Sequence, residues 1–93
     1  MIIGSCKVYL NLPYSHSLKE KRMVVKSVIS RVGNKFNASI AEVENQDLHQ
    51  SIVIGFAVVT TSSTHANSII QHIINFIESN CEADIVDTDI EII

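Results

Sequence analysis

Residues 50–61 read QSIVIGFAVVTT, and every position from Ile52 to Val59 is apolar or glycine. Successive side chains of a β-strand point to opposite faces of the sheet, so a strand made of this run is apolar on both faces. Such a strand belongs in the middle of a sheet, where one face packs on the core and the outer face also needs a cover. This stretch therefore predicts a long central strand.

Two kinds of periodicity divide the rest of the chain into strands and helices. The side chains of residues 2–12 alternate between two rows with the period of a half-buried strand, and Pro13 ends this predicted strand. Ser17 stands three residues before Glu20, which is the spacing of a capping box, and the apolar side chains that follow share one helical face. The predicted elements are a strand over 2–12, a helix from 18 to about 32 that Gly33-Asn34 ends, a strand over 37–44, the strand over 50–61, a helix from the 62–64 cap to about 80, and a strand over 83–93.

The predicted order β-α-β-β-α-β indicates a single α+β domain that spans residues 1–93. The economical packing of this order is the ferredoxin-like fold, a four-stranded antiparallel sheet with both helices on one face. Right-handed crossovers then predict the strand order 4-1-3-2. The first and last strands are neighbours in this order, so Lys7 is predicted to form cross-strand ion pairs with acids of the last strand. Those acids are Asp87, Asp89 and Glu91.

Charges are strongly segregated along the chain. All seven lysines and arginines lie within the first 36 residues, where Glu20 is the only acid, so this part carries +6. Residues 37–93 contain nine acids and no lysine or arginine, so they carry -9, although the net charge of the chain is only -3. A basic segment set against an acidic remainder indicates a surface that contacts an anionic partner.

The basic segment centres on residues 15–22, SHSLKEKR, at the predicted start of the first helix. Cations at a helix N-terminus oppose the helix dipole, which suggests that they serve a partner. Helical spacing places Lys19, Arg22 and Lys26 on one flank, where they form a ridge that suits phosphates. Lys21 is predicted on the other side of the apolar stripe. The predicted anion- or RNA-binding residues are these four cations together with the neutral donors Ser15, His16 and Ser17. The alternative is an ordinary solvated helix face.

The outer face of the predicted sheet is a second candidate surface. If the outward row of the third strand contains Phe56, then Phe56 and Tyr9 are neighbours on this face. Two aromatic side chains there have two uses, which are stacking on RNA bases and contact with a protein. The adjacent edge strand carries acids, and the basic-aromatic signature of RNA-recognition domains is absent. We therefore favour a protein contact, most simply homodimerisation through Tyr9 and Phe56.

Two stretches of the chain resemble a known family. The run LPYSHSLKEKR over residues 12–22 and the run AEVENQDL over residues 41–48 resemble the YlxP-like family of small bacterial domains, and the similarity covers essentially the whole chain. The resemblance implies a ferredoxin-like fold and no defined activity. Genes of this family commonly lie beside those for a translation initiation factor and a ribosome-binding factor, which implies a connection with RNA or the ribosome. Many relatives have Trp where this chain has His49, so the resemblance supports no stacking role there.

Motifs for catalysis or metal binding are weak or missing. His65 and His72 are seven residues apart on the predicted second helix, whereas two histidines that share a metal are usually four apart. The acidic last strand is expected to be solvated. No Gly-rich phosphate loop, nucleophile elbow or HExxH motif is present, and a Ser-His-Asp set built from residues 15–17 and Asp47 has little support. We expect no enzymatic activity, no cofactor and no metal.

Cysteine usage and hydropathy predict the cellular setting. Cys6 and Cys81 are too few for a disulfide framework, so we expect two reduced thiols. No apolar run approaches the roughly 20 residues of a membrane span, so we expect a cytoplasmic domain without a membrane contact.

The leading hypothesis from the sequence is a non-enzymatic homodimer that binds structured or ribosomal RNA, or a ribosomal particle, through the start of its first helix. The alternative is a homodimeric protein-interaction module with no nucleic-acid role. In that alternative the helix cations pair with an acidic partner or with the acidic strand of a second subunit.

Overall fold

The computed structural model describes all 93 residues and contains four strands and two helices in the predicted order. The elements are β1 (Ile2–Asn11), α1 (Leu18–Lys35), β2 (Ser39–Glu44), β3 (Ser51–Thr60), α2 (Ser63–Asn80) and β4 (Asp84–Ile92). Neither helix combines the length and the apolar character that crossing a membrane requires.

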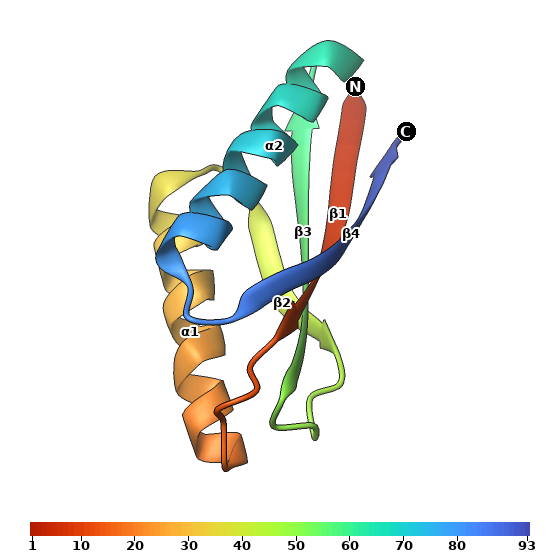
Figure 1. Cartoon of the computed structure of the whole chain (residues 1–93). Coiled ribbons are helices and arrows are strands. Elements are labelled where there is room, and N and C mark those ends of the chain that lie inside the picture. Colours follow the sequence, from red (N-terminus) through yellow and green to blue (C-terminus); the bar gives the residue numbers. More distant parts are fainter.

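The four strands form one antiparallel sheet in the order β2-β3-β1-β4. This is the predicted order read from the opposite edge, and both helices cover the same face of the sheet (Figure 1). The fold is therefore α+β and ferredoxin-like, as predicted. The two termini lie at one end of the sheet, where backbone hydrogen bonds join Ile3 and Ile93, and the β1–α1 and β2–β3 loops lie at the other end.

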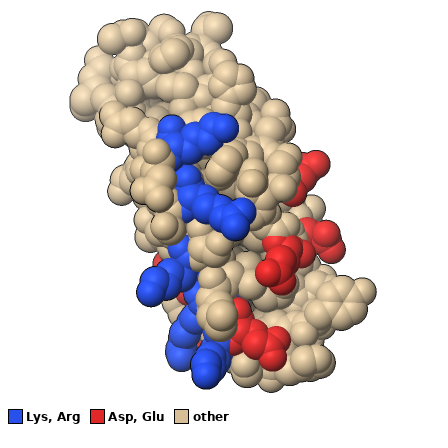
Figure 2. Space-filling model, turned by 90° about the vertical axis from the view of Figure 1, so that its left-hand side faces the viewer, with Lys and Arg blue, Asp and Glu red and all other residues tan.

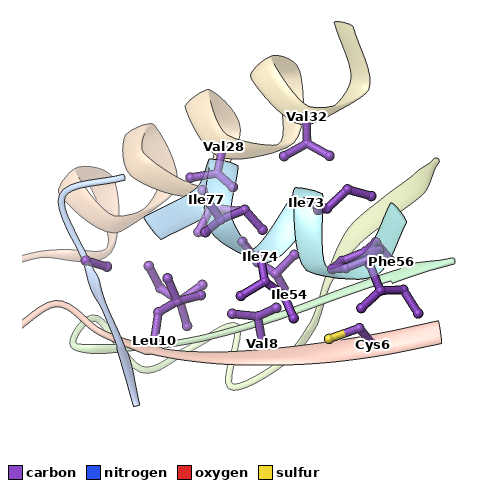
Figure 3. Close-up of a cluster of buried hydrophobic side chains, with 14 of the residues drawn as sticks. Cys6, Val8, Leu10, Val28, Val32, Ile54, Phe56, Ile73, Ile74 and Ile77 are labelled. Carbon is purple, nitrogen blue, oxygen red and sulfur yellow. The ribbon is translucent and has the colours of Figure 1, made fainter. Parts of the chain in front are cut away.

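The core fills the layer between the sheet and the two helices. Alternate residues of β1 point into this layer and pair with buried residues of β3, for example Val8 with Ile54. Full burial of a Val, Leu, Ile or Phe side chain stabilises a fold by about 1.5–3 kcal/mol, so this layer supplies most of the favourable free energy of folding. Figure 3 shows the cluster, whose labelled members are Cys6, Val8, Leu10, Val28, Val32, Ile54, Phe56, Ile73, Ile74 and Ile77.

The outward row of β3 differs from the row that we considered. Phe56 is only 3% exposed and pairs with Cys6 of β1, so it belongs to the core between the sheet and the helices. The prediction that Phe56 lies beside Tyr9 on the open face is therefore wrong. Tyr9 pairs with Val53 instead. The outward row consists of Val53, Gly55, Ala57 and Val59. Both rows of this strand are apolar, so alternation alone cannot distinguish them.

α1 is nearly one turn longer than predicted. It continues through Gly33, which has no positive φ, and ends at Lys35. The N–H of Phe36 donates to the carbonyl of Val32 at 2.8 Å. The Phe36 ring meets the ring of Phe76 on α2 edge to face, with 5.6 Å between the centroids, and Nζ of Lys35 lies 4.9 Å from the Phe76 centroid. These contacts with α2 hold the last turn in helical form.

Gly4 allows α2 to approach β1 closely. A Cβ atom at this position would lie 2.9 Å from Cδ1 of Ile70 and 3.3 Å from Cβ of Ala66, both on α2. Both distances are shorter than ordinary van der Waals contact. A larger residue at position 4 would therefore push the helix and the strand apart.

We expect Gly4→Ala to destabilise the protein by about 1–3 kcal/mol, because overpacking a dense core displaces its neighbours. The matched control is Gly33→Ala, since a Cβ at this exposed helical position has nothing within 4 Å. The control should stabilise the protein by about 0.5–1 kcal/mol, as alanine favours the helix. Urea unfolding measures both changes. An unchanged midpoint for Gly4→Ala would show that β1 and α2 separate without cost.

Candidate functional site

The start of α1 is capped by its own side chains. Oγ of Ser17 accepts a hydrogen bond from the N–H of Glu20 at 3.2 Å, and Oε2 of Glu20 accepts one from the N–H of His16 at 3.2 Å. The predicted cap is therefore present, but the carboxylate binds one residue earlier than in the usual capping box. Glu20 also places a negative charge at the positive end of the helix dipole.

This capping leaves little of the anion site that we predicted at the helix N-terminus. Ser15 is 2% exposed, and its hydroxyl donates to the carbonyl of Ser17 at 3.0 Å. The hydroxyl of Ser17 itself serves as the cap. His16 is exposed and is the one predicted neutral donor whose side chain makes no such bond. Ser15 and Ser17 are thus committed to local structure, and the carboxylate of Glu20 occupies the end of the helix.

Lys21 lies in a different environment from the other cations of α1. Its side chain is completely buried, whereas we predicted it on the surface. Nζ lies 2.5 Å from the carbonyl oxygen of Asn45, 2.6 Å from that of Leu48 and 3.3 Å from that of Gln46. Lys21 is therefore an internal contact between α1 and the β2–β3 loop. This corrects its place in the predicted anion-binding set, because a buried ammonium cannot reach an external phosphate.

The ammonium group of Lys21 has a complete set of partners. A lysine ammonium donates three protons, and three backbone carbonyls surround it. Oε2 of Glu42 lies 2.9 Å from Nζ but accepts no well-oriented hydrogen bond, so Glu42 acts as a counter-charge. The Glu42 side chain is 16% exposed, so this pair has lost most of its contact with water. A buried ammonium without such partners would cost several kcal/mol.

The β2–β3 loop is folded around this ammonium. Asn45 has a φ of 59°, in the left-handed region that asparagine adopts more readily than most residues. Its carbonyl also accepts the N–H of Leu48 at 3.0 Å, and its side-chain amide donates to the hydroxyl of Ser51 at 3.0 Å. The turn therefore directs several backbone carbonyls toward one point, which Lys21 occupies.

The sequence contains a signal for the burial of Lys21. This residue precedes Val25, Val28 and Val32 by four, seven and eleven positions, which is the spacing of one buried helical face. The structure shows that these four residues are the buried ones of α1. A lysine in line with an apolar stripe, and not beside it, indicates an internal ammonium that needs acceptors from another element.

The remaining predicted cations form an exposed row on α1. Lys19, Arg22 and Lys26 are all exposed, and none of them forms a salt bridge within the chain. Arg31 and Lys35 are also exposed, and their contacts with Asn80 and Phe76 place them on the flank that faces α2. Figure 2 shows the lysines and arginines as a band along one side of the molecule, with acids on the neighbouring surface.

An ion pair crosses the open face of the sheet. Nζ of Lys7 and Oε2 of Glu44 are 2.7 Å apart, so Lys7 reaches across β3 to β2. Gly55, the neighbour of Lys7 on β3, has no side chain in the way, and the irregular pairing around Val43 turns Glu44 to this face. The predicted pairing of Lys7 with the acids of β4 is wrong, although Asp89 is opposite Lys7 in the register. The hydrogen bond that Lys7 donates to Glu44 raises the pKa of Lys7.

Apolar side chains remain on this open face, which neither helix covers (Figure 1). Tyr9 is half-buried and lies between Val53 of β3 and Asp87 of β4. Val43 and Val59 expose 41% and 66% of their surface. The face therefore combines apolar area with an ion pair and an acidic edge.

The groups that we considered for metal binding and catalysis are dispersed. His65 and His72 are exposed on α2, and nowhere do three or more His, Cys, Asp or Glu side chains form a group that could hold a metal ion. Asp47 and His49 line a shallow pocket in the β2–β3 loop, but His16 does not line it.

Both cysteines are free. Burial raises the pKa of Cys6 to about 11 and also raises the pKa of Cys81. Both thiols are therefore protonated at neutral pH, and a protonated thiol is a poor nucleophile and a poor metal ligand.

The chain has relatives among known proteins. Residues 3–90 match the model of a family described as "Protein of unknown function (DUF503)". The chain is also 44% identical over 63 residues to "Uncharacterized protein YlxP" of Bacillus subtilis (strain 168), and this alignment covers 68% of each chain. The chain belongs to the DUF503 family. The predicted resemblance to YlxP-like proteins is thus confirmed, and the family description assigns no activity to its members.

The two stretches that resemble YlxP-like proteins meet in the structure of this DUF503 chain. Residues 12–22 contain Lys21, and residues 41–48 contain Glu42 and the three carbonyls that surround its ammonium. In this chain the two stretches therefore form one internal contact, and the first of them also carries exposed cations.

We expect Lys21→Met to destabilise the protein by about 3–5 kcal/mol, because the change leaves the charge of Glu42 and three carbonyls without their partner. The control is Lys19→Met, a change of the same kind on the exposed face of α1, which should alter stability by less than about 0.5 kcal/mol. Guanidinium unfolding followed by circular dichroism measures both. Equal stability of the two variants would mean that the Lys21 contact is dispensable.

Proposed function

We propose that this chain is a non-enzymatic cytoplasmic domain that binds structured RNA, such as the RNA surface of a ribosomal particle, through Lys19, Arg22 and Lys26. The observation that carries the proposal is the row of three exposed cations on one face of α1, none of which is neutralised within the chain. Unpaired cations in a row are the usual means by which proteins contact a phosphate backbone.

The spacing of the row suits such a backbone. α1 rises about 10 Å between Lys19 and Lys26, at 1.5 Å per residue, so the row can contact more than one phosphate. Arg22 can hold a phosphate with two parallel hydrogen bonds, whereas the two lysines act as point charges. Contacts of this number and kind support a dissociation constant of about 10⁻⁴ to 10⁻⁶ M at physiological salt. A single chain is therefore expected to bind RNA weakly.

The acids of the chain restrict how RNA can approach. Figure 2 shows acidic side chains on the surface next to the basic band. Charges are screened over about 8 Å at physiological ionic strength, so a phosphate close to α1 is attracted while one over the acidic surface is repelled. RNA should therefore lie along α1 and avoid the rest of the molecule.

Two observations support a binding role without catalysis. The side chains of His16, Asp47 and His49 do not share a pocket, and the pKa values of both thiols are raised, which disfavours a thiolate nucleophile. The proposal of a cytoplasmic location is supported by two free cysteines, the usual state of cysteine in a reducing compartment.

We expect replacement of Lys19, Arg22 and Lys26 by Ala to abolish binding of a fluorescently labelled ribosomal RNA fragment, measured by anisotropy. For the wild type, the logarithm of the binding constant should fall with the logarithm of salt concentration with a slope of about -2 to -3, because three phosphate contacts release their counterions. Cosedimentation with ribosomal particles should weaken with salt in the same way.

The matched control replaces Lys7, Arg31 and Lys35 by Ala, which removes the same number of charges from other parts of the surface. This control should keep most of the affinity. If the two triple variants lose affinity equally, the attraction comes from net charge and not from the row. If the first variant binds like the wild type, RNA binding through α1 is excluded.

The open face of the sheet favours a second candidate function, a homodimer. Its half-buried Tyr9 and the exposed Val59 lie on a face that neither helix covers. A second copy that packs against this face would remove the apolar area from water. Phe56 has no part in this interface because it is buried in the core.

We expect Tyr9→Glu to convert a dimer into a monomer in multi-angle light scattering, because the change places a charge in the centre of the apolar contact. Tyr14→Glu is the control, since Tyr14 is 84% exposed in the β1–α1 loop and lies outside the sheet. A dimer that survives Tyr9→Glu would place the interface elsewhere. A wild-type chain that is monomeric at all concentrations would exclude this candidate.

A further inference from the structure

A groove runs along the flank of α1 that faces α2. Three hollows lie end to end there, and neighbouring hollows share lining residues, first Val24 and Glu82 and then Ser79 and Asn80. The first hollow begins at the β1–α1 loop, and the third reaches the last turn of α1. The three adjoining hollows, here called the groove, together extend along almost the whole length of the helix. The groove is separate from the exposed row that we propose for RNA.

The two ends of this groove carry opposite charges. Glu20 lines the end next to the β1–α1 loop, and Glu82 lies where this first hollow adjoins the middle one. Arg31 lines the middle hollow, and Lys35 lines the far one. None of these four side chains forms a salt bridge within the chain. Charges of both signs without a salt-bridge partner, with Glu20 at one end of the surface and Lys35 at the other, complement a partner that carries the opposite charges in the opposite order.

The length of α1 sets the spacing of those charges. Glu20 precedes Arg31 by eleven residues and Lys35 by fifteen, so the charges are about 16 Å and about 22 Å apart along the helix axis. An extended peptide advances about 3.3 Å per residue. A basic and an acidic side chain that match the two ends are therefore separated by about five to seven residues of extended chain.

The acidic end has the composition of a site for a long cationic side chain. Tyr14 is 84% exposed and Met23 is 67% exposed, and both line the same hollow as Glu20 and Glu82. The apolar stem of a lysine or arginine can pack on Met23, while its charged head stacks on the Tyr14 ring and pairs with the carboxylates. This hollow accounts for two large apolar side chains that have no role in the core.

The basic end has free donors for a carboxylate. Nη1 of Arg31 donates to the carbonyl of Asn80 over 3.4 Å, which is a long bond, and its other N–H groups have no acceptor within the chain. A guanidinium can bind a carboxylate with two parallel hydrogen bonds. An acidic side chain of a partner can therefore lie over Arg31 and be supported by Lys35.

Other occupants fit the groove less well. A nucleic-acid strand would bring phosphates against Glu20 and Glu82, where like charges repel. A second copy of this chain lacks the required extended segment, because every lysine and arginine except Lys7 lies in the helix α1. Lys7 is itself held by Glu44 in the middle of the sheet. The occupant that fits the groove is therefore a segment of a different protein.

We infer that the groove between α1 and α2 binds an extended segment of another protein in which a lysine or arginine is separated from an aspartate or glutamate by five to seven residues. The basic side chain enters the hollow beside Tyr14, and the acidic side chain binds Arg31. Failure of this inference leaves the RNA proposal untouched, because the two surfaces share none of their charged residues.

The test begins with a library of random 12-residue peptides displayed on phage and selected on the immobilised full-length protein. Selected peptides should be enriched in a basic and an acidic residue at this spacing. A peptide from the selection is then titrated by fluorescence anisotropy. Glu82→Lys and Arg31→Glu should each weaken its binding by tenfold or more, and Glu91→Lys, on β4, should change it by less than twofold.

A compensating pair of changes separates a direct contact from a disturbed fold. Replacement of the acidic residue of the peptide by Lys should restore its binding to the Arg31→Glu protein and weaken its binding to the wild type. Melting temperatures of all variants show that they remain folded.

Three results would overturn the inference. The first is a selection without a preferred spacing of charges, and the second is full affinity of the Glu82→Lys and Arg31→Glu proteins for the peptide. The third is displacement of the peptide by a single-stranded RNA whose own binding is lost in Arg31→Glu, because the groove would then hold phosphates.

Discussion

The contact between the Lys21 ammonium and the β2–β3 loop is the constraint on which the arrangement of this molecule depends. A fully buried ammonium is tolerable only if acceptors surround it, and three backbone carbonyls together with the Glu42 carboxylate do so. These partners exist only when α1 lies on the sheet beside β2 and the loop turns through Asn45. One side chain thus couples the orientation of a helix to the conformation of a loop at the same end of the molecule.

This coupling also decides which cations of α1 face the solvent. With Lys21 in line with the buried valines, helical geometry directs Lys19, Arg22 and Lys26 away from the core. The carboxylate of Glu20 caps the helix and lies in the groove on the other flank. The basic segment therefore divides into three parts with different surroundings, which are an internal ammonium, an exposed row and the wall of a groove. A proposed RNA contact and a proposed peptide contact use different parts.

Much of the fold could be predicted because it depends on local periodicity and on general rules of connection. Alternation located the strands, apolar stripes located the helices, and the handedness of crossovers led to the strand order. The site was harder to predict. Lys21 was misplaced because lysine is rarely buried, and the partner of Lys7 was missed because Gly55 and the irregularity at Val43 open a path across β3. Phe56 was assigned to the wrong face because both rows of β3 are apolar.

The sequence by itself determined the element order, the ferredoxin-like topology, the cap formed by Ser17 and Glu20, and the segregation of charge, because these follow from local periodicity, from the general rules of connection and from where the charged residues stand along the chain. Tertiary structure alone decided the partners of Lys21 and Lys7, the outward row of β3, and the groove between α1 and α2. Each of these depends on atoms from elements far apart in the sequence. The distance between two such elements is set by how their side chains pack, as it is for β1 and α2 at Gly4. A pattern along one segment does not specify that distance.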